Sequence, residues 1–174
     1  MRRLALLLFC CVLLSSIGCK SRRKRPPVQL TEEAGLASVI QAADPRAASQ
    51  FVKGFHVVEN NSWRWTTHAF TVTLRPPRNA AQNGARLMLT FVIPDVVLEK
   101  VHSMKLSAKV NGLDLPPEQY TNAGAKTFTR DVPASALSGE AATVDFTLDK
   151  FLPPTANDQR ELGIIVSAAG LEAK

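Results

Sequence analysis

Apolar and polar residues alternate along most of the chain after residue 55, which is the period of a β-strand with one buried face. We expect the apolar members of each run to face a common core, with the polar members in water. The alternating runs are residues 70–74, 87–93, 105–110 and 143–149, and a nearly continuous apolar run covers residues 162–166.

Turn residues separate these runs, and we expect the prolines at Pro76-Pro77, Pro94, Pro116-Pro117, Pro133 and Pro153-Pro154 to lie in loops. Asn111-Gly112 predicts a two-residue type I′ hairpin turn, because both central residues of that turn need a positive φ. Many short strands without crossover helices predict a mainly β fold, an antiparallel β-sandwich of about seven to nine strands. Immunoglobulin-like and jelly-roll-like topologies both fit this pattern.

Residues 30–53 have the spacing of a helix instead. Leu36, Val39, Ile40 and Ala43 fall at i, i+3, i+4 and i+7, and Thr31 is a suitable N-cap. Asp44-Pro45 ends this helix and starts a second one, for which Gly54 is the expected C-terminal stop. One or two short helices in residues 30–53 therefore precede the sandwich, which we expect over residues 54–174.

The N-terminus has the three parts of an export signal: Arg2 and Arg3, an apolar run from Leu4 to Leu14, and small residues. The run is shorter than the ~20 apolar residues of a membrane-spanning helix. Ser16-Ile17-Gly18-Cys19 resembles the lipobox of bacterial lipoproteins, which implies a signal peptide over residues 1–18 and acylation of Cys19. The alternative is an ordinary secretory signal with a chance cysteine.

The positive charge of the chain lies almost entirely outside the predicted sandwich. The formal net charge is +6, but from Pro26 onward there are 14 basic and 15 acidic residues, so nucleic acid is not an expected partner. The basic run from Lys20 to Arg25 lies in a tether over residues 19–29, where it favours anionic lipid headgroups beside the acylated Cys19. These features predict a lipid-anchored protein of the bacterial cell envelope. In a Gram-negative cell, Lys20 after the cysteine favours the outer membrane, at its periplasmic face or the cell surface.

No motif in the sequence indicates an enzyme, and we expect no catalytic residues, cofactor or metal. Cys10 and Cys11 lie in the signal, so the mature chain has no disulfide and no cysteine-based site. His56, His68 and His102 are widely separated, which disfavours a three-histidine metal site. Glu59 and Asp149 would form a hydrolase pair only if folding brought them within roughly 5–10 Å.

Both tryptophans lie in one segment, residues 54–66. Trp63 and Trp65 would share one face of a strand, with Arg64 on the other. Indole rings stack on sugar faces and Glu59 or Arg64 can bind hydroxyls, so Glu59, Trp63, Arg64 and Trp65 are candidate glycan-binding residues. The alternative is that at least one indole is core and that Glu59 pairs with Arg64.

This segment also carries a resemblance. Glu59 with Trp63-Arg64-Trp65-Thr66 resembles β-sandwich domains appended to bacterial glycosyltransferases and methyltransferases of envelope-polysaccharide loci. That resemblance implies a structural signature or a glycan contact at these residues. The chain as a whole resembles an uncharacterised bacterial lipoprotein family, through Cys19, Arg130-Asp131-Val132-Pro133, Asp149-Lys150 and Arg160-Glu161-Leu162-Gly163.

Residues 149–163 form a second unusual segment, with charges around Pro153-Pro154. Either it is a loop closed by an ion pair of Asp158 or Arg160, or it contacts a ligand. Three hypotheses remain: a non-enzymatic anchored module that binds envelope glycan, an assembly lipoprotein that binds another envelope protein, or a hydrolase with an unrecognised carboxylate pair.

Overall fold

The computed structural model describes residues 35–174. Cys19, the signal, the basic tether and the Thr31 cap lie outside these residues. The elements are β1 (Val39–Gln41), η1 (Pro45–Gln50, a 3-10 helix), β2 (Phe51–Glu59), β3 (Trp63–Leu74), α1 (Ala80–Asn83), β4 (Ala85–Ile93), α2 (Asp95–Val101), β5 (Met104–Val110), β6 (Leu113–Tyr120), β7 (Gly124–Val132), η2 (Ala134–Ala136), β8 (Ala142–Leu148) and β9 (Ile165–Ala173).

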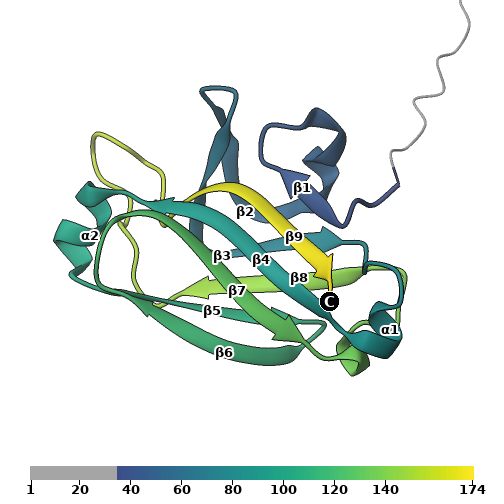
Figure 1. Cartoon of the computed structure of the whole chain (residues 1–174). Coiled ribbons are helices and arrows are strands. Elements are labelled where there is room, and N and C mark those ends of the chain that lie inside the picture. The colour runs from purple at the N-terminus through teal and green to yellow at the C-terminus, as the bar shows by residue number, and fades with distance from the viewer. Residues whose placement is uncertain (1–34) are drawn as a thin grey trace, which may run out of the picture. The chain divides into compact units, whose positions relative to one another are not determined.

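The strands form an antiparallel sandwich, as the alternation predicts. Their order is β6-β5-β8-β3-β9-β4-β7, with β1 added to β9 and β2 added to β3. Strand β3 joins the two halves, because its residues 69–74 pair with β8 whereas Arg64 and Trp65 pair with β9. Figure 1 shows these halves as two layers, β9-β4-β7 and β8-β5-β6.

The core lies between the two layers. The apolar residues at the alternate, inward-facing positions of the runs are buried, including Phe70, Phe91 and Phe146. Aromatic rings connect the layers: Phe128 of β7 meets Phe146 of β8 edge-on at 6.5 Å between centroids, and Phe91 of β4 meets Tyr120 of β6 at 5.5 Å. Aromatic pairs in such geometries stabilise a core beyond their buried area.

The predicted hairpin turn is confirmed. Val110 pairs with Leu113 across the two residues Asn111 (φ 48°) and Gly112 (φ 85°), which connect β5 to β6. The Asn111 side chain also accepts from the backbone N–H of Thr143 (2.9 Å) and donates to a carbonyl in η2, so the turn is tied to the start of β8.

Pro116 and Pro117 do not lie in a loop, so that prediction was wrong. They lie within β6, which pairs only with β5 on the path of the sheet, and occupy a bulge between the pairs Leu106–Glu118 and Ala108–Leu115. Proline lacks the N–H that a central strand must donate, but an edge strand with a bulge does not need it.

The N-terminal segment differs from the prediction in one of its two helices. Val39–Gln41 is a strand, β1, which pairs with β9, so the helix predicted through Leu36 to Ala43 does not form in the described part. The second helix is present as η1, and Pro45 lies in its first turn. The Asp44 carboxylate caps this helix by accepting from the backbone N–H of Arg46. It ends at Gln50, and Gly54 lies inside β2 rather than at a helix end.

The helices of residues 35–174 are short, and α2, with seven residues, is the longest of them. None of them is long and apolar enough to cross a membrane.

Candidate functional site

The β2–β3 hairpin positions the candidate residues around its tip. Glu59 and Trp63 are directly opposite one another, joined by a turn in which Asn60 and Asn61 both have positive φ (48° and 51°). Asparagine tolerates that conformation better than most residues. Opposed residues in an antiparallel pair share a face, so Glu59 lies beside Trp63, and Trp65 lies two residues further along the same face.

Trp65 belongs to a row of apolar side chains on the outer face of the sandwich. Trp65 pairs with Ile165 of β9, which pairs with Val92 of β4. Val92 is 38% exposed, whereas its neighbours Phe91 and Ile93 are buried, so this row faces away from the core. The outer surface of the β3–β9–β4 layer is therefore an apolar strip that begins at the tryptophans.

Neither tryptophan is fully exposed, as a pure glycan platform predicts, or fully buried, as a core position predicts. Both are partly exposed, and Trp65 also packs against the core. The indole Nε1 of Trp63 is buried and has no hydrogen-bond partner within residues 35–174. The Trp65 ring is thus held by packing, and both rings still present part of their surface to solvent.

Arg64 points to the other face and has a structural environment. Its guanidinium donates to the carbonyl oxygens of Ala42 (3.0 Å) and His56 (3.2 Å), and lies 5.2 Å from the ring centroid of Phe51. These contacts tie the chain before η1 to the hairpin. Arg64 does not pair with Glu59, so the local ion pair of the alternative interpretation does not form.

Glu59 instead pairs with Arg160, at 2.6 Å between Glu59 Oε1 and Arg160 Nη1. The same guanidinium binds Asp158 through Nε and Nη2, at 3.0 and 2.9 Å. The ion pair predicted to close the loop of residues 149–163 is therefore confirmed, and it also joins the loop to the hairpin tip. The two unusual segments of the sequence meet at this cluster.

Hydrogen bonding to Arg160 lowers the pKa of the Asp158 carboxyl to about 2. The hydrogen bonds that Arg160 donates to Asp158 and Glu59 raise the pKa of its guanidinium. The side chains of Arg160, Glu59 and Asp158 are each about a third exposed to solvent, so water screens the attraction between them. The geometry favours Asp158 ionised and Arg160 charged at every physiological pH.

Further contacts fix the loop along β2 and β3. Glu161 accepts from the backbone N–H of His68 and contacts Nδ1 of the same residue at 2.6 Å. The Glu161 carbonyl oxygen lies 2.8 Å from Nε2 of His56, and Phe151 stacks on the His68 ring at 4.9 Å. His56 and His68 are thus structural partners of one loop residue.

The two carboxylates considered as a hydrolase pair, Glu59 and Asp149, each have a different partner. Glu59 is bound by Arg160, and Asp149 accepts from the backbone N–H of Lys105 at 2.6 Å. A general acid needs a carboxyl that stays protonated near neutral pH, which requires a raised pKa. The pKa of Asp158 is lowered instead, because Arg160 stabilises its ionised form. Within residues 35–174, no three His, Cys, Asp or Glu side chains gather in a way that could hold a metal.

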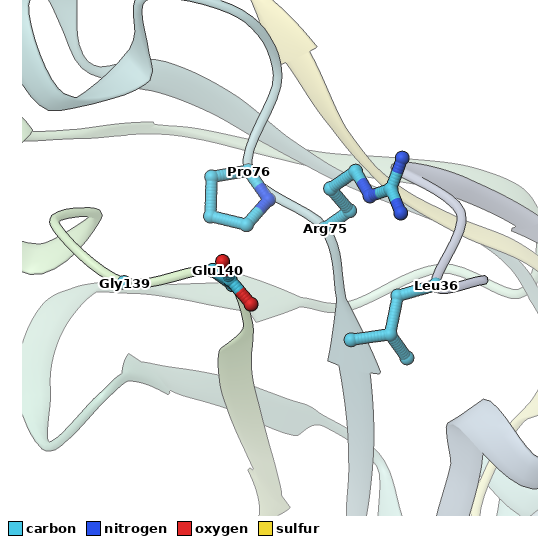
Figure 2. Close-up of a pocket in the computed structure, with 5 residues that line it drawn as sticks. All are labelled: Leu36, Arg75, Pro76, Gly139 and Glu140. Carbon is cyan, nitrogen blue, oxygen red and sulfur yellow. The ribbon is translucent and has the colours of Figure 1, made fainter.

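A surface hollow is lined by none of the candidate glycan-binding residues, and no motif in the sequence points to it. Its volume is about 480 Å³, and Figure 2 shows the residues that line it, Leu36, Arg75, Pro76, Gly139 and Glu140. They come from three separate parts of the chain, and the Arg75 backbone N–H donates to the carbonyl of Ala37. The hollow combines one cation, one anion and two apolar side chains, which is an ordinary surface mixture.

No family model matches the chain, and no curated protein matches it. The predicted membership of a lipoprotein family therefore stays a prediction.

Several solved structures are similar. The CBM36-1 domain of a multidomain xylanase from the hindgut metagenome of Trinervitermes trinervoides is 9% identical, with 78% of this chain and 96% of that chain covered and a TM-score of 0.43. The CBM51-2 and INT domains of Clostridium perfringens ZmpB are 16% identical, with 79% of this chain and 28% of that chain covered and a TM-score of 0.37. A family GH115 4-O-methyl-alpha-glucuronidase, BtGH115A, is 8% identical over 80% of this chain and 18% of that chain, with a TM-score of 0.42.

Proposed function

We propose that this protein is a lipid-anchored, non-enzymatic module of the bacterial cell envelope that binds glycan through the outer face at Trp63 and Trp65. The observation that carries the proposal is the position of Glu59. It lies opposite Trp63 on the face shared by both partly exposed indoles. Ring faces that stack on sugars, with a carboxylate beside them to accept from hydroxyls, are the two components that a glycan platform requires.

The rigidity of this surface also supports binding. Trp65 packs against the core and pairs with Ile165, so little side-chain freedom remains to be lost when a ligand stacks on it. The apolar strip continues over Ile165 to Val92, which gives an extended polymer a surface beyond a single sugar ring.

The anchor in this proposal is Cys19, with the basic run from Lys20 to Arg25 beside it. A diacylglyceryl group supplies two acyl chains, which is enough for stable attachment to a bilayer. Metabolic labelling with a palmitate analogue tests this part separately. Label on the wild-type chain and none on Cys19→Ser supports it, and equal label on both contradicts it.

Intrinsic fluorescence tests the glycan site directly, because the chain has only two tryptophans and both lie in it. We expect cellohexaose or N-acetylchitohexaose to shift or quench the emission of the full-length chain in detergent micelles. Trp63→Ala and Trp65→Ala should each weaken binding about tenfold or more, equivalent to ~1.4 kcal/mol, when it is measured by calorimetry.

Leu113→Ala is the matched control, because Leu113 is 41% exposed on β6, which pairs with β5 and not with β2 or β3, and its truncation should leave both fold and binding unchanged. A folded sample that gives neither a fluorescence change nor heat with any glycan would contradict the proposal.

The alternative function is binding of another envelope protein. It is favoured by Val52 and Val57, which are 55% and 75% exposed on β2, a strand that pairs only with β3 in the described part of the chain. An exposed strand of this kind can accept a partner strand. Val52→Lys would abolish that interaction and would leave glycan binding intact.

A further inference from the structure

We propose that residues 149–163, the latch loop, form the second wall of the glycan site, that Arg160 is the residue that positions this wall, and that the wall selects uncharged sugars over acidic ones. This inference rests on the proposed function, since it describes how the same site is completed. It assigns Arg160 and the latch loop to the site in addition to the residues of the hairpin.

Arg160 joins the latch loop to the tip of the hairpin. Its Nη1 holds Glu59 at 2.6 Å, and its Nε and Nη2 hold both oxygens of Asp158. Glu59 is the residue directly opposite Trp63, so this guanidinium fixes the loop next to the tryptophan face. Paired charges and a planar, multiply bonded guanidinium define one geometry rather than a range of them.

The latch loop is also fixed at positions on either side of its exposed centre. Phe151 stacks on His68, and Glu161 contacts both His68 and His56. Residues 153–157 between them are exposed, and the backbone N–H of Asp158 donates to Thr155 Oγ1 at 3.1 Å in a tight turn. The centre is thus a rigid, solvent-facing projection, as a binding wall must be.

The charge preference of the wall follows from the existing contacts of its two cations, Lys150 and Arg160. Lys150 donates to the Val101 carbonyl oxygen (3.1 Å) and to Ser103 Oγ (3.2 Å), at the end of α2. Arg160 is held between two carboxylates. Neither cation of the loop is left to neutralise an acidic ligand, whereas carboxylate and amide oxygens remain to accept from sugar hydroxyls. A uronic acid would add a further negative charge beside Glu59 and Asp158.

The test compares cellohexaose, which is uncharged, with hexagalacturonate, which is acidic, by calorimetry on the full-length chain in detergent micelles. We expect the wild type to bind cellohexaose at least about threefold more tightly at low ionic strength, and the difference to shrink in high salt. Glu59→Gln keeps an acceptor for Arg160 and removes one charge. It should weaken cellohexaose binding, because Glu59 is one of the acceptors of the site, and it should raise the ratio of hexagalacturonate affinity to cellohexaose affinity by about threefold.

The positioning role is tested with Arg160→Ala, which should bind cellohexaose about tenfold less tightly than the wild type. Arg160→Lys should recover at least half of that loss in binding free energy. Arg78→Ala, which removes an exposed arginine outside the loop, is the control. Circular dichroism confirms that each variant is folded. A role confined to stability would lower the melting temperature of Arg160→Ala and leave the affinity of the folded protein unchanged.

The possible failures are distinguishable. If the wild type binds none of the three glycans, cellohexaose, hexagalacturonate and N-acetylchitohexaose, the proposed function itself fails. If the wild type binds and Arg160→Ala binds equally well, the latch loop is not part of the site although the function stands. If hexagalacturonate binds as tightly as cellohexaose, the selection of uncharged sugars is wrong. Should Arg160→Ala not fold, Glu59→Gln still decides the charge selection and Arg160→Lys the positioning.

Discussion

Arg130 joins the two end strands of the sandwich, so replacing it by alanine should open one side of the fold. Its guanidinium donates to the carbonyl oxygens of Pro116 (2.6 Å) and Pro117 (3.1 Å) and pairs with Glu118 at 2.9 Å. It also lies 4.4 Å from the ring centroid of Phe128. Arg130 is in β7 and its partners are in β6, the opposite ends of the strand order, so this one side chain bridges the gap between them.

The expected loss follows from these contacts. Each net hydrogen bond contributes roughly 0.5–1.5 kcal/mol, and a cation over an aromatic ring about 0.5–1 kcal/mol. The side chain is 20% exposed, so water replaces part of what is lost when it is removed. Arg130→Ala should therefore lower the free energy of unfolding by about 2–3 kcal/mol, a fall in Tm of roughly 6–12 °C for a domain of this size.

Urea unfolding followed by circular dichroism measures this loss, with Arg78→Ala as the control. Arg78 is an exposed arginine that lies outside both end strands, and its removal should change stability by less than about 0.5 kcal/mol. Arg130→Lys should give an intermediate loss, because an ammonium keeps the charge but cannot reach both proline carbonyls in a fixed geometry. A loss below about 0.5 kcal/mol for Arg130→Ala would refute the bridge between β6 and β7.

Three further predictions concern single positions. Asp158 should titrate with a midpoint of about 2 in carboxyl NMR shifts, because Arg160 lowers its pKa, and a midpoint near 4 would contradict the pair. Since this pKa is lowered in the folded state, the stability that the Asp158 carboxylate contributes is present above a pH of about 4 and is lost as the pH falls through about 2. Gly54→Ala should destabilise by at least about 3 kcal/mol, because φ is +76° and a Cβ would overlap the backbone of β3, whereas Gly112→Ala, with φ +85° and open space, should cost about 1 kcal/mol in urea unfolding. Phe146→Ala should cost about 3–5 kcal/mol in the same assay, because the ring is 1% exposed and contacts both layers, and a cost under 1 kcal/mol would mean that the ring is not central to the core.

The alternation of the sequence predicts the sandwich because each strand has one buried and one wet face. Leu106, Ala108 and Val110 are buried in β5, while Lys105 and Lys109, at the alternate positions, are exposed. This information is local, so it can be read from one strand at a time. The Asn111-Gly112 turn is local in the same way.

The first N-terminal helix was wrongly predicted because β1 is determined by a distant partner. Only three residues, Val39–Gln41, form the strand, and they pair with Gly170 to Ala168 near the C-terminus. Gly170 leaves room for Val39, since a Cβ there would lie 2.9 Å from Val39 Cγ2. Helical spacing in residues 36–43 carries no information about this pairing, and tertiary contacts override such weak propensities.

The sequence pointed to both halves of the candidate site but not to their contact. The types and spacing of Glu59, Trp63 and Trp65 singled out the hairpin, and the charges around the prolines singled out the latch loop. The ion pair between Glu59 and Arg160 spans 101 residues, and nothing local distinguishes it from a pair with the neighbouring Arg64. Only the fold, which places β9 beside β3, decides between these partners.

The central claim is that glycan binds on the Trp63–Trp65 face against the latch loop, and NMR shift mapping with cellohexaose tests it most directly. The two indole N–H signals are the only ones in the chain, so they are assigned by replacing either tryptophan. We expect both indole signals, and the backbone amides of Asp158 and Arg160, to shift together with one saturation curve. Shifts confined to the hollow at Arg75, or to the exposed side of β2, with the indole signals unmoved, would contradict the account.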